Sequence, residues 1–169
     1  KKLFLLTLIT GLFLSLNSSA QQDKSKRPSP PAKVSKTLAS GAEISVDYSQ
    51  PSLKGRALSA LAPVGKVWRT GANEATVFET SKDVKIEGKT LPAGKYGLYT
   101  IPGDQEWTII FSKSWKQWGT VYKENEDALR VNVKAGKSSE NTEVFTFDIA
   151  DNGNVSMLWA DTKVVFKVQ

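Results

Sequence analysis

The sequence predicts an all-β fold: a single-domain antiparallel β-sandwich of jelly-roll-like form with at most one or two short helical turns. Three observations support this prediction. Apolar and polar residues alternate over short runs, which is the pattern of a half-buried strand. Gly, Pro, Asn and Asp recur between these runs and mark turns. No segment has the long amphipathic pattern of a surface helix, and short strands at this spacing are typical of sandwiches.

The first twenty residues have the composition of a secretory signal peptide. Lys1 and Lys2 precede an apolar run over 3–16, and small polar residues lead to Ala20. The run is interrupted by Thr, Gly and Ser and is short for a hydrocarbon core of about 30 Å. We therefore expect cleavage after Ala20 and export to the periplasm or the extracellular space, with no membrane span after signal cleavage.

A basic, Pro-containing segment follows at 21–33, and we interpret it as a solvated linker before a β-sandwich domain at 34–169. The chain has a formal net charge of +6 at pH 7, and part of this excess lies in the linker. Basic and acidic residues are mixed through the domain, whereas a nucleic-acid binder concentrates basic residues on one face. We therefore expect no nucleic-acid partner.

Nine segments of the domain have strand character. In 43–48, for example, Ile44, Val46 and Tyr48 alternate with polar residues. The predicted strands lie at 43–48, 75–78, 84–86, 96–101, 107–111, 129–134, 145–149, 155–159 and 163–168. Only 56–63 and 124–130 have helical character, over about two turns or fewer.

The Asn152-Gly153 pair predicts a tight two-residue turn between the strands at 145–149 and 155–159, which should therefore pair antiparallel. A short turn at 160–162 should separate the second of these strands from the last one. Lys163 and Lys167 suit an edge or solvent-facing side of that last strand.

The chain contains no Cys and no His. The absence of Cys excludes disulfides, thiol nucleophiles and thiolate metal sites. The absence of His removes the commonest general base and the commonest transition-metal ligand. We expect no metal and no cofactor, and hydrolase triads and zinc sites of the usual kinds are excluded.

The most unusual polar cluster lies in 65-GKVWRTGANEATVF-78. If 70–73 is a hairpin loop, Arg69 and Glu74 face each other across its mouth, and such a pair contributes about 0.2–1 kcal/mol. In this structural interpretation Trp68 closes one end of the core and the cluster only stabilises the fold. The protein would then be a purely structural or interaction domain.

The same residues also suit a binding site, because Arg binds carboxylate or phosphate in a bidentate manner and aromatic faces stack on sugars. The upstream segment 47–56 adds a Tyr and a second Arg. The candidate ligand-binding residues are Tyr48, Arg56, Trp68, Arg69, Asn73 and Glu74. We expect the partner to be a small polar or anionic ligand or a cell-envelope glycan, bound without catalysis. The oligomeric state is not predicted.

A glycosidase-like hydrolase is the alternative. Such an enzyme needs two carboxylates about 5–10 Å apart, one of which has a raised pKa. Glu74 is the candidate acid or base, and Asp47 is its candidate partner.

The tryptophans allow a further alternative, an aromatic platform for a glycan. Trp107 precedes an apolar strand and is expected in the core, whereas Trp115 and Trp118 flank a loop in which an exposed ring could stack on sugar.

Six segments resemble motifs of the domain of unknown function 2911 family of small exported proteins. They are 27-RPSPPAKVS-35, 47-DYSQPSLKGR-56, 65-GKVWRTGANEAT-76, 91-LPAGKYGLYTIPG-103, 106-EWTIIF-111 and 117-QWG-119. The resemblance covers nearly the whole mature chain and is weakest at 112–116 and in the C-terminal hairpin. It implies an exported, β-rich domain with no assigned activity, cofactor or catalytic residue.

Overall fold

The computed structural model describes residues 23–169. The expected signal peptide and the first two linker residues lie outside this range. No helix within 23–169 combines the length and the apolar character needed to span a bilayer.

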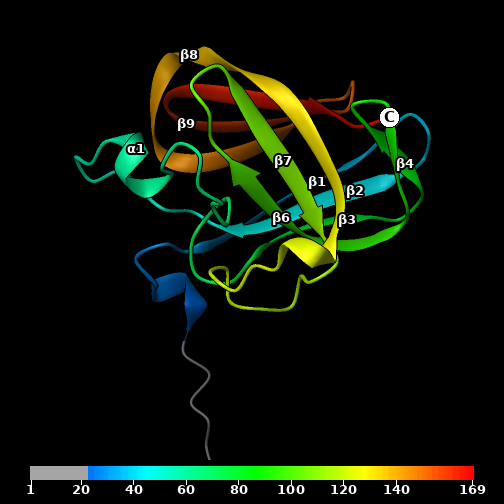
Figure 1. Ribbon diagram of the computed structural model, residues 1–169, viewed down its shortest axis with the longest axis horizontal. Coiled ribbons are helices and arrows are strands. Elements are labelled where there is room, and N and C mark those ends of the chain that lie inside the picture. Colours follow the sequence, from blue (N-terminus) through cyan, green and yellow to red (C-terminus); the bar gives the residue numbers. More distant parts are fainter. Residues whose placement is uncertain (1–22) are drawn as a thin grey trace, which may run out of the picture.

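Seven strands form one antiparallel sheet in the order β1-β2-β3-β6-β7-β8-β9, and β4 and β5 form a separate small hairpin (Figure 1). The strands of the large sheet are β1 (Pro31–Thr37), β2 (Glu43–Ser49), β3 (Thr76–Thr80), β6 (Gly94–Ile101), β7 (Glu106–Ser112), β8 (Asp127–Ile149) and β9 (Asn154–Lys167). The small hairpin pairs β4 (Val84–Ile86) with β5 (Lys89–Leu91). Within residues 23–169, helical structure is confined to the single turn α1 (Leu58–Leu61) and two 3-10 turns, η1 (Lys24–Lys26) and η2 (Glu124–Glu126).

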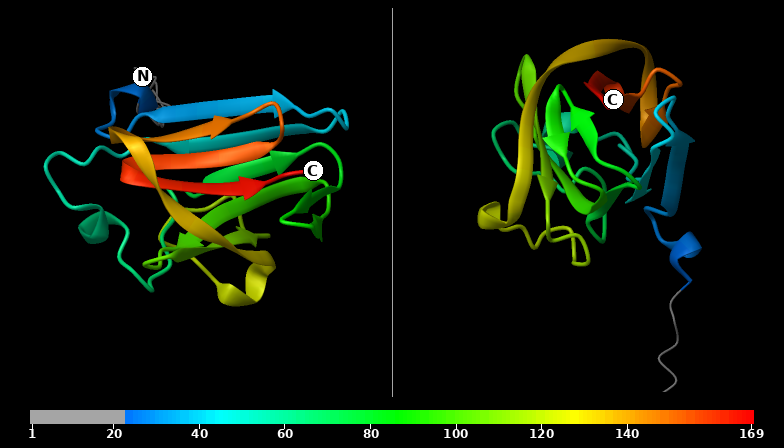
Figure 2. Two further views of the ribbon diagram at one scale, coloured as in Figure 1. Left: turned by 90° about the horizontal axis from the view of Figure 1, so that it is seen from above. Right: turned by 90° about the vertical axis from the view of Figure 1, so that its right-hand side faces the viewer.

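The large sheet folds over itself through its longest strand. The N-terminal part of β8 pairs with β7 and its C-terminal part pairs with β9, with register shifts between Lys137 and Thr146 where the strand bends. Figure 2 shows β8 arching from one layer to the other. The segment after β2 contacts the C-terminal part of β8, because Phe145 donates its backbone N–H to Pro51 O at 2.9 Å. The predicted all-β antiparallel fold is confirmed, and its two layers are parts of one continuous sheet.

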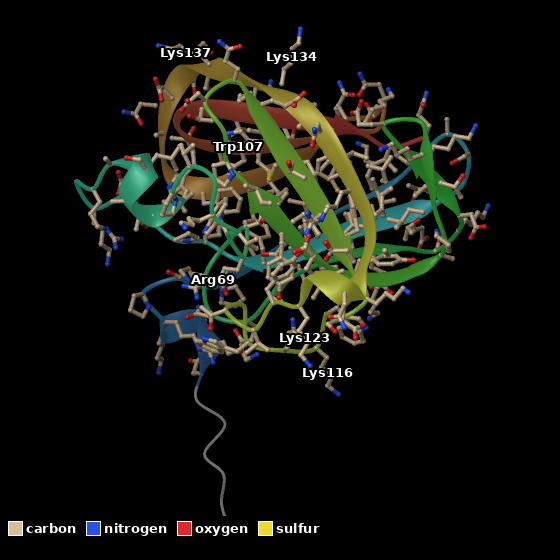
Figure 3. The ribbon with its side chains drawn as sticks, viewed as in Figure 1. Arg69, Trp107, Lys116, Lys123, Lys134 and Lys137 are labelled. Carbon is tan, nitrogen blue, oxygen red and sulfur yellow. The ribbon has the colours of Figure 1, made fainter. Side chains whose placement is uncertain are left out.

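The core lies between these two layers and is built from the residues that the alternating pattern predicts to face inward. Ile44 and Val46 on β2 and Phe145 and Phe147 on β8 are at most 1% exposed. Each such side chain contributes about 1.5–3 kcal/mol through burial. Trp107 is only 6% exposed, so its predicted place in the core is confirmed (Figure 3).

The predicted antiparallel pairing of the C-terminal strands is confirmed, but their connection is longer than predicted. It spans four residues, 150–153, and Gly153 has φ 84°. A Cβ on Gly153 would lie 2.1 Å from Val168 O, so glycine is needed there for close approach as well as for the turn. The predicted last strand is not separate either. β9 runs through 160–162, and Ala160 takes up the bend with φ 52°.

Candidate functional site

The loop between α1 and β3 carries most of the candidate residues, and buried threonines fix its backbone. Trp68 and Thr100 on β6 exchange backbone hydrogen bonds of 2.7 and 2.9 Å. Thr70 has φ 52° and is fully buried, and its Oγ1 lies 3.2 Å from Thr100 Oγ1. Thr76 Oγ1 donates to Thr70 O at 2.8 Å. The sequence did not single out these threonines, because nothing local distinguishes them from ordinary strand residues.

Glu74 is paired with the N-terminal segment, so the predicted Arg69–Glu74 pair is wrong. Arg27 Nη1 lies 3.0 and 2.8 Å from the two Glu74 carboxylate oxygens, and Lys24 Nζ lies 3.0 Å from Oε1. The hairpin geometry assumed for 70–73 fails because the 73–75 backbone pairs with the 117–119 segment instead. Gly119 donates to Asn73 O, and Ala75 donates to Gln117 O, both at 3.0 Å.

The N-terminal segment is therefore part of the fold, which corrects its interpretation as a solvated linker. β1 begins at Pro31, inside that segment, and pairs with β2. Asn73 Nδ2 donates to Ser29 O at 3.0 Å and holds the preceding residues against the loop. Asn73 and Glu74 thus serve as the docking point of the N-terminal segment.

The ion pairs determine the protonation state of Glu74. Partial burial acts to raise its pKa, but hydrogen bonds from its own backbone N–H, Lys24 and Arg27 outweigh burial and lower the pKa to about 2. A general acid needs the opposite shift. Glu74 and Asp47 do line one hollow of about 260 Å³, but Asp47 is paired with Lys33 at 2.9 Å.

Tyr48 also lines this hollow, but its ring and hydroxyl serve the core. The ring packs edge-on against Phe147 with centroids 4.9 Å apart. The hydroxyl accepts the Phe147 backbone N–H at 3.1 Å, and burial raises the pKa of Tyr48. Tyr48 is 6% exposed.

A cleft of about 630 Å³ brings together Arg56, Trp68 and Arg69. Figure 3 shows Arg69 in the loop before β3. The other lining residues are Ser29, Pro51, Leu61, Pro63, Val67, Gly71, Ala72, Gly119, Thr120, Tyr122 and Trp159. Tyr48, Asn73 and Glu74 do not line it. Val67, Gly71 and Ala72 belong to the same motif as Arg69. Ser29, Trp159 and the residues of 119–122 come from segments distant in sequence, so no local motif could have identified them.

Among residues 23–169, the two guanidinium groups in the cleft have no acidic partner. Arg56 donates to Leu53 O and Ser52 O, both at 2.9 Å, and Arg69 donates only to Gly71 O, at 3.4 Å. Neither arginine forms an ion pair within residues 23–169, and no Asp or Glu is among the lining residues. The cleft is therefore electropositive, and most guanidinium N–H groups of Arg69 have no acceptor among the residues that the structure describes.

Aromatic side chains form the base of the cleft. The rings of Trp68 and Trp159 are stacked, with centroids 5.5 Å apart and an interplanar angle of 17°. Phe145 packs against Trp68 at 5.0 Å, and Trp159 Nε1 donates to Glu143 O at 3.2 Å. These contacts fix the base in one conformation, because each indole is packed by rings or held by a hydrogen bond.

Gly119, Thr120 and Tyr122 of the 113–126 connection also line the cleft, and Gly119 makes room for Arg69. A Cβ on Gly119 would lie 2.5 Å from Arg69 Cδ. Tyr122 donates its hydroxyl proton to Asp127 at 2.8 Å and accepts from Arg130 at 2.7 Å. Burial and the Asp127 carboxylate raise the pKa of Tyr122 to about 12, so its hydroxyl is neutral at pH 7 and is not a base.

The other predicted features are placed as follows. Trp118 is 50% exposed, and Lys95 lies 5.3 Å from the ring centroid of Trp115. In the part of the chain that the structure describes, no three His, Cys, Asp or Glu residues are grouped to hold a metal ion.

A family model described as "Protein of unknown function (DUF2911)" matches residues 29–168, which confirms the family resemblance. Neither the search of curated proteins nor the search of solved structures finds a match.

Proposed function

Since the chain belongs to the DUF2911 family, whose description gives no activity, we propose its function from the site itself: a non-catalytic binding protein for a small anionic ligand. The ligand is held in the 630 Å³ cleft by Arg69 and Arg56. Carboxylate or phosphate is the matching chemistry, because a guanidinium fork presents paired N–H donors to two oxygens. A cell-envelope glycan that carries such a group fits the export predicted from residues 1–20.

One observation carries this proposal: two arginines line the same cleft without an acidic partner among the residues described. The other two arginines of the chain, Arg27 and Arg130, are ion-paired with Glu74 and Asp127. An anionic ligand would supply the acceptors that the cleft lacks.

Catalysis by the Asp47–Glu74 pair is disfavoured. Both carboxylates are occupied by cationic side chains, and the lowered pKa of Glu74 makes it a weak base and a poor proton donor at neutral pH.

The test is calorimetric titration of carboxylates, phosphates and uronic-acid oligosaccharides into wild type and Arg69→Gln. Gln keeps much of the aliphatic stem and removes the charge. We expect a 10- to 100-fold loss of affinity, since hydrogen bonds to charged groups contribute about 1.5–3 kcal/mol. Lys134→Gln is the matched control, because Lys134 is exposed on β8 and does not line the cleft (Figure 3). Equal affinity of wild type and Arg69→Gln would refute the proposal.

A further inference from the structure

The volume of the cleft exceeds what a small anion needs. At about 630 Å³ it is in the range of pockets that enclose drug-sized ligands, roughly 300–1,000 Å³. An ion the size of acetate or phosphate would satisfy the guanidinium groups and leave most of the cleft to water. The remaining volume indicates a ligand with a larger body.

One side of the cleft is apolar. Leu61, Pro63 and Val67 contribute side chains from the segment around and after α1, and the Trp68–Trp159 pair lies at the base. Val67 is 41% exposed, although large apolar side chains gain free energy when they are covered. Of the polar lining groups, Arg69 follows Val67 on the same loop, whereas Thr120 and Tyr122 come from the connection between β7 and β8.

We infer that the ligand is an amphipathic anion, a carboxylate or phosphate that carries an apolar body of several carbon atoms. This inference rests on the proposed function, because Arg69 and Arg56 hold the charged group. The apolar body lies against Leu61, Pro63 and Val67, and it covers surface that a simple anion would leave in water.

The apolar side belongs to a weakly anchored segment. Ala62 is the only buried residue of 54–66. Leu58 and Leu61 are half-buried against the core, and backbone bonds from Arg56 to Leu53 and from Gly65 to Pro102 hold the segment near its ends. Segments with so few buried contacts open locally at low free energy. A ligand body that packs on Leu61 and Pro63 therefore protects the 54–66 amides from hydrogen exchange, whereas acetate does not.

The experiment is a calorimetric titration of the purified protein with acetate, butanoate, hexanoate and octanoate at one pH and salt concentration. The charged group is constant in this series, so only the apolar body changes. We expect affinity to rise about two- to fourfold for each added methylene, as burial of a CH₂ group requires. Octanol, which lacks the charge, should bind at least tenfold more weakly than octanoate.

Two variants separate the apolar contact from the charged contact. Leu61→Ser should flatten the dependence on chain length and leave acetate binding unchanged, while Arg69→Gln should weaken every member of the series. Val64→Ser is the matched control, because Val64 is on the same segment, is 54% exposed and does not line this cleft. Val67→Ser provides a second variant of the apolar side if Leu61→Ser disturbs folding.

The failures of the two proposals are distinguishable. Equal affinity for acetate and octanoate, with both lost in Arg69→Gln, would overturn the amphipathic ligand and keep the anion site. Octanoate binding that Arg69→Gln leaves unchanged, or no binding of any member, would overturn both. Unchanged exchange of the 54–66 amides with octanoate bound would also overturn the inferred position of the apolar body.

Discussion

Arg69 and Glu74 are five positions apart in one loop, yet their surroundings are opposite. Glu74 is saturated by Arg27 and Lys24, and its neighbour Asn73 holds the backbone at Ser29. Arg69 makes one 3.4 Å hydrogen bond to the backbone and lines a cleft without carboxylates. The paired charge of Glu74 holds the N-terminal segment to the loop. Arg69 forms no ion pair within residues 23–169, and we therefore propose it as the anion-binding residue.

The largest expected effect concerns Trp68, the residue of this loop that is buried in the core. Trp68→Ala should lower the free energy of unfolding by about 3–5 kcal/mol, because it leaves a cavity beside Trp159 and Phe145. Denaturant titration measures this loss. Trp118→Ala, at a ring that is 50% exposed, should change it by less than about 0.5 kcal/mol. Similar losses in the two variants would contradict the core position of Trp68.

Gly119→Ala affects the close contacts of residue 119 with Arg69 and Asn73. Its Cβ would lie 2.5 Å from Arg69 Cδ and 2.9 Å from Asn73 O, and overpacking of this kind costs about 1–3 kcal/mol. The variant should therefore lose both stability and anion affinity. Gly136→Ala is the control, since its added Cβ would make only an ordinary van der Waals contact, 3.7 Å from Lys163 O. A fully stable Gly119→Ala variant with normal binding would show that Arg69 does not pack there.

Glu74→Gln tests the ion pairs of Glu74 through the pH dependence of stability. The pKa of Glu74 is about 2 in the folded protein and near 4.5 when unperturbed, so its ion pairs stabilise the fold fully above about pH 4.5. This contribution is lost as the pH falls toward 2. The pairs are partly exposed, so we expect about 1 kcal/mol or less at pH 7.

The measurement is the difference in unfolding free energy between wild type and Glu74→Gln from pH 7 to pH 2. This difference should shrink below about pH 4.5. Glu140→Gln is the control, because Glu140 is exposed and forms no ion pair in the described part of the chain. A difference that is constant with pH would contradict the lowered pKa of Glu74.

The sequence predicted the parts of the fold that depend on local periodicity. The alternation around Val46 and Phe147 identified inward-facing residues correctly, and Asn152-Gly153 marked the hairpin. It did not predict that Arg27 pairs with Glu74, 47 residues away, because a contact of that range leaves no local pattern. The bend of β8 was missed for a related reason: its bulges depend on pairing with β9.

The candidate site, too, was predicted only in part from the sequence. Arg56, Trp68 and Arg69 were identified by residue type and share a cleft. Tyr48 was added from the segment 47–56 by residue type, but its hydroxyl accepts a hydrogen bond from the Phe147 backbone in the core. Residue chemistry identified the arginines, but only tertiary structure shows which polar groups already have partners.

The central claim is that Arg69 serves ligand binding and not the stability of the fold. Its most direct test is the unfolding free energy of Arg69→Gln, measured beside wild type with and without octanoate. Without ligand we predict a change of less than about 0.5 kcal/mol, because Arg69 forms no ion pair within residues 23–169. With octanoate only the wild type should be stabilised, as selective binding to the folded state requires. A loss of about 1–3 kcal/mol without ligand would instead make Arg69 part of the structural network, and equal stabilisation of both proteins by octanoate would place the anion site elsewhere.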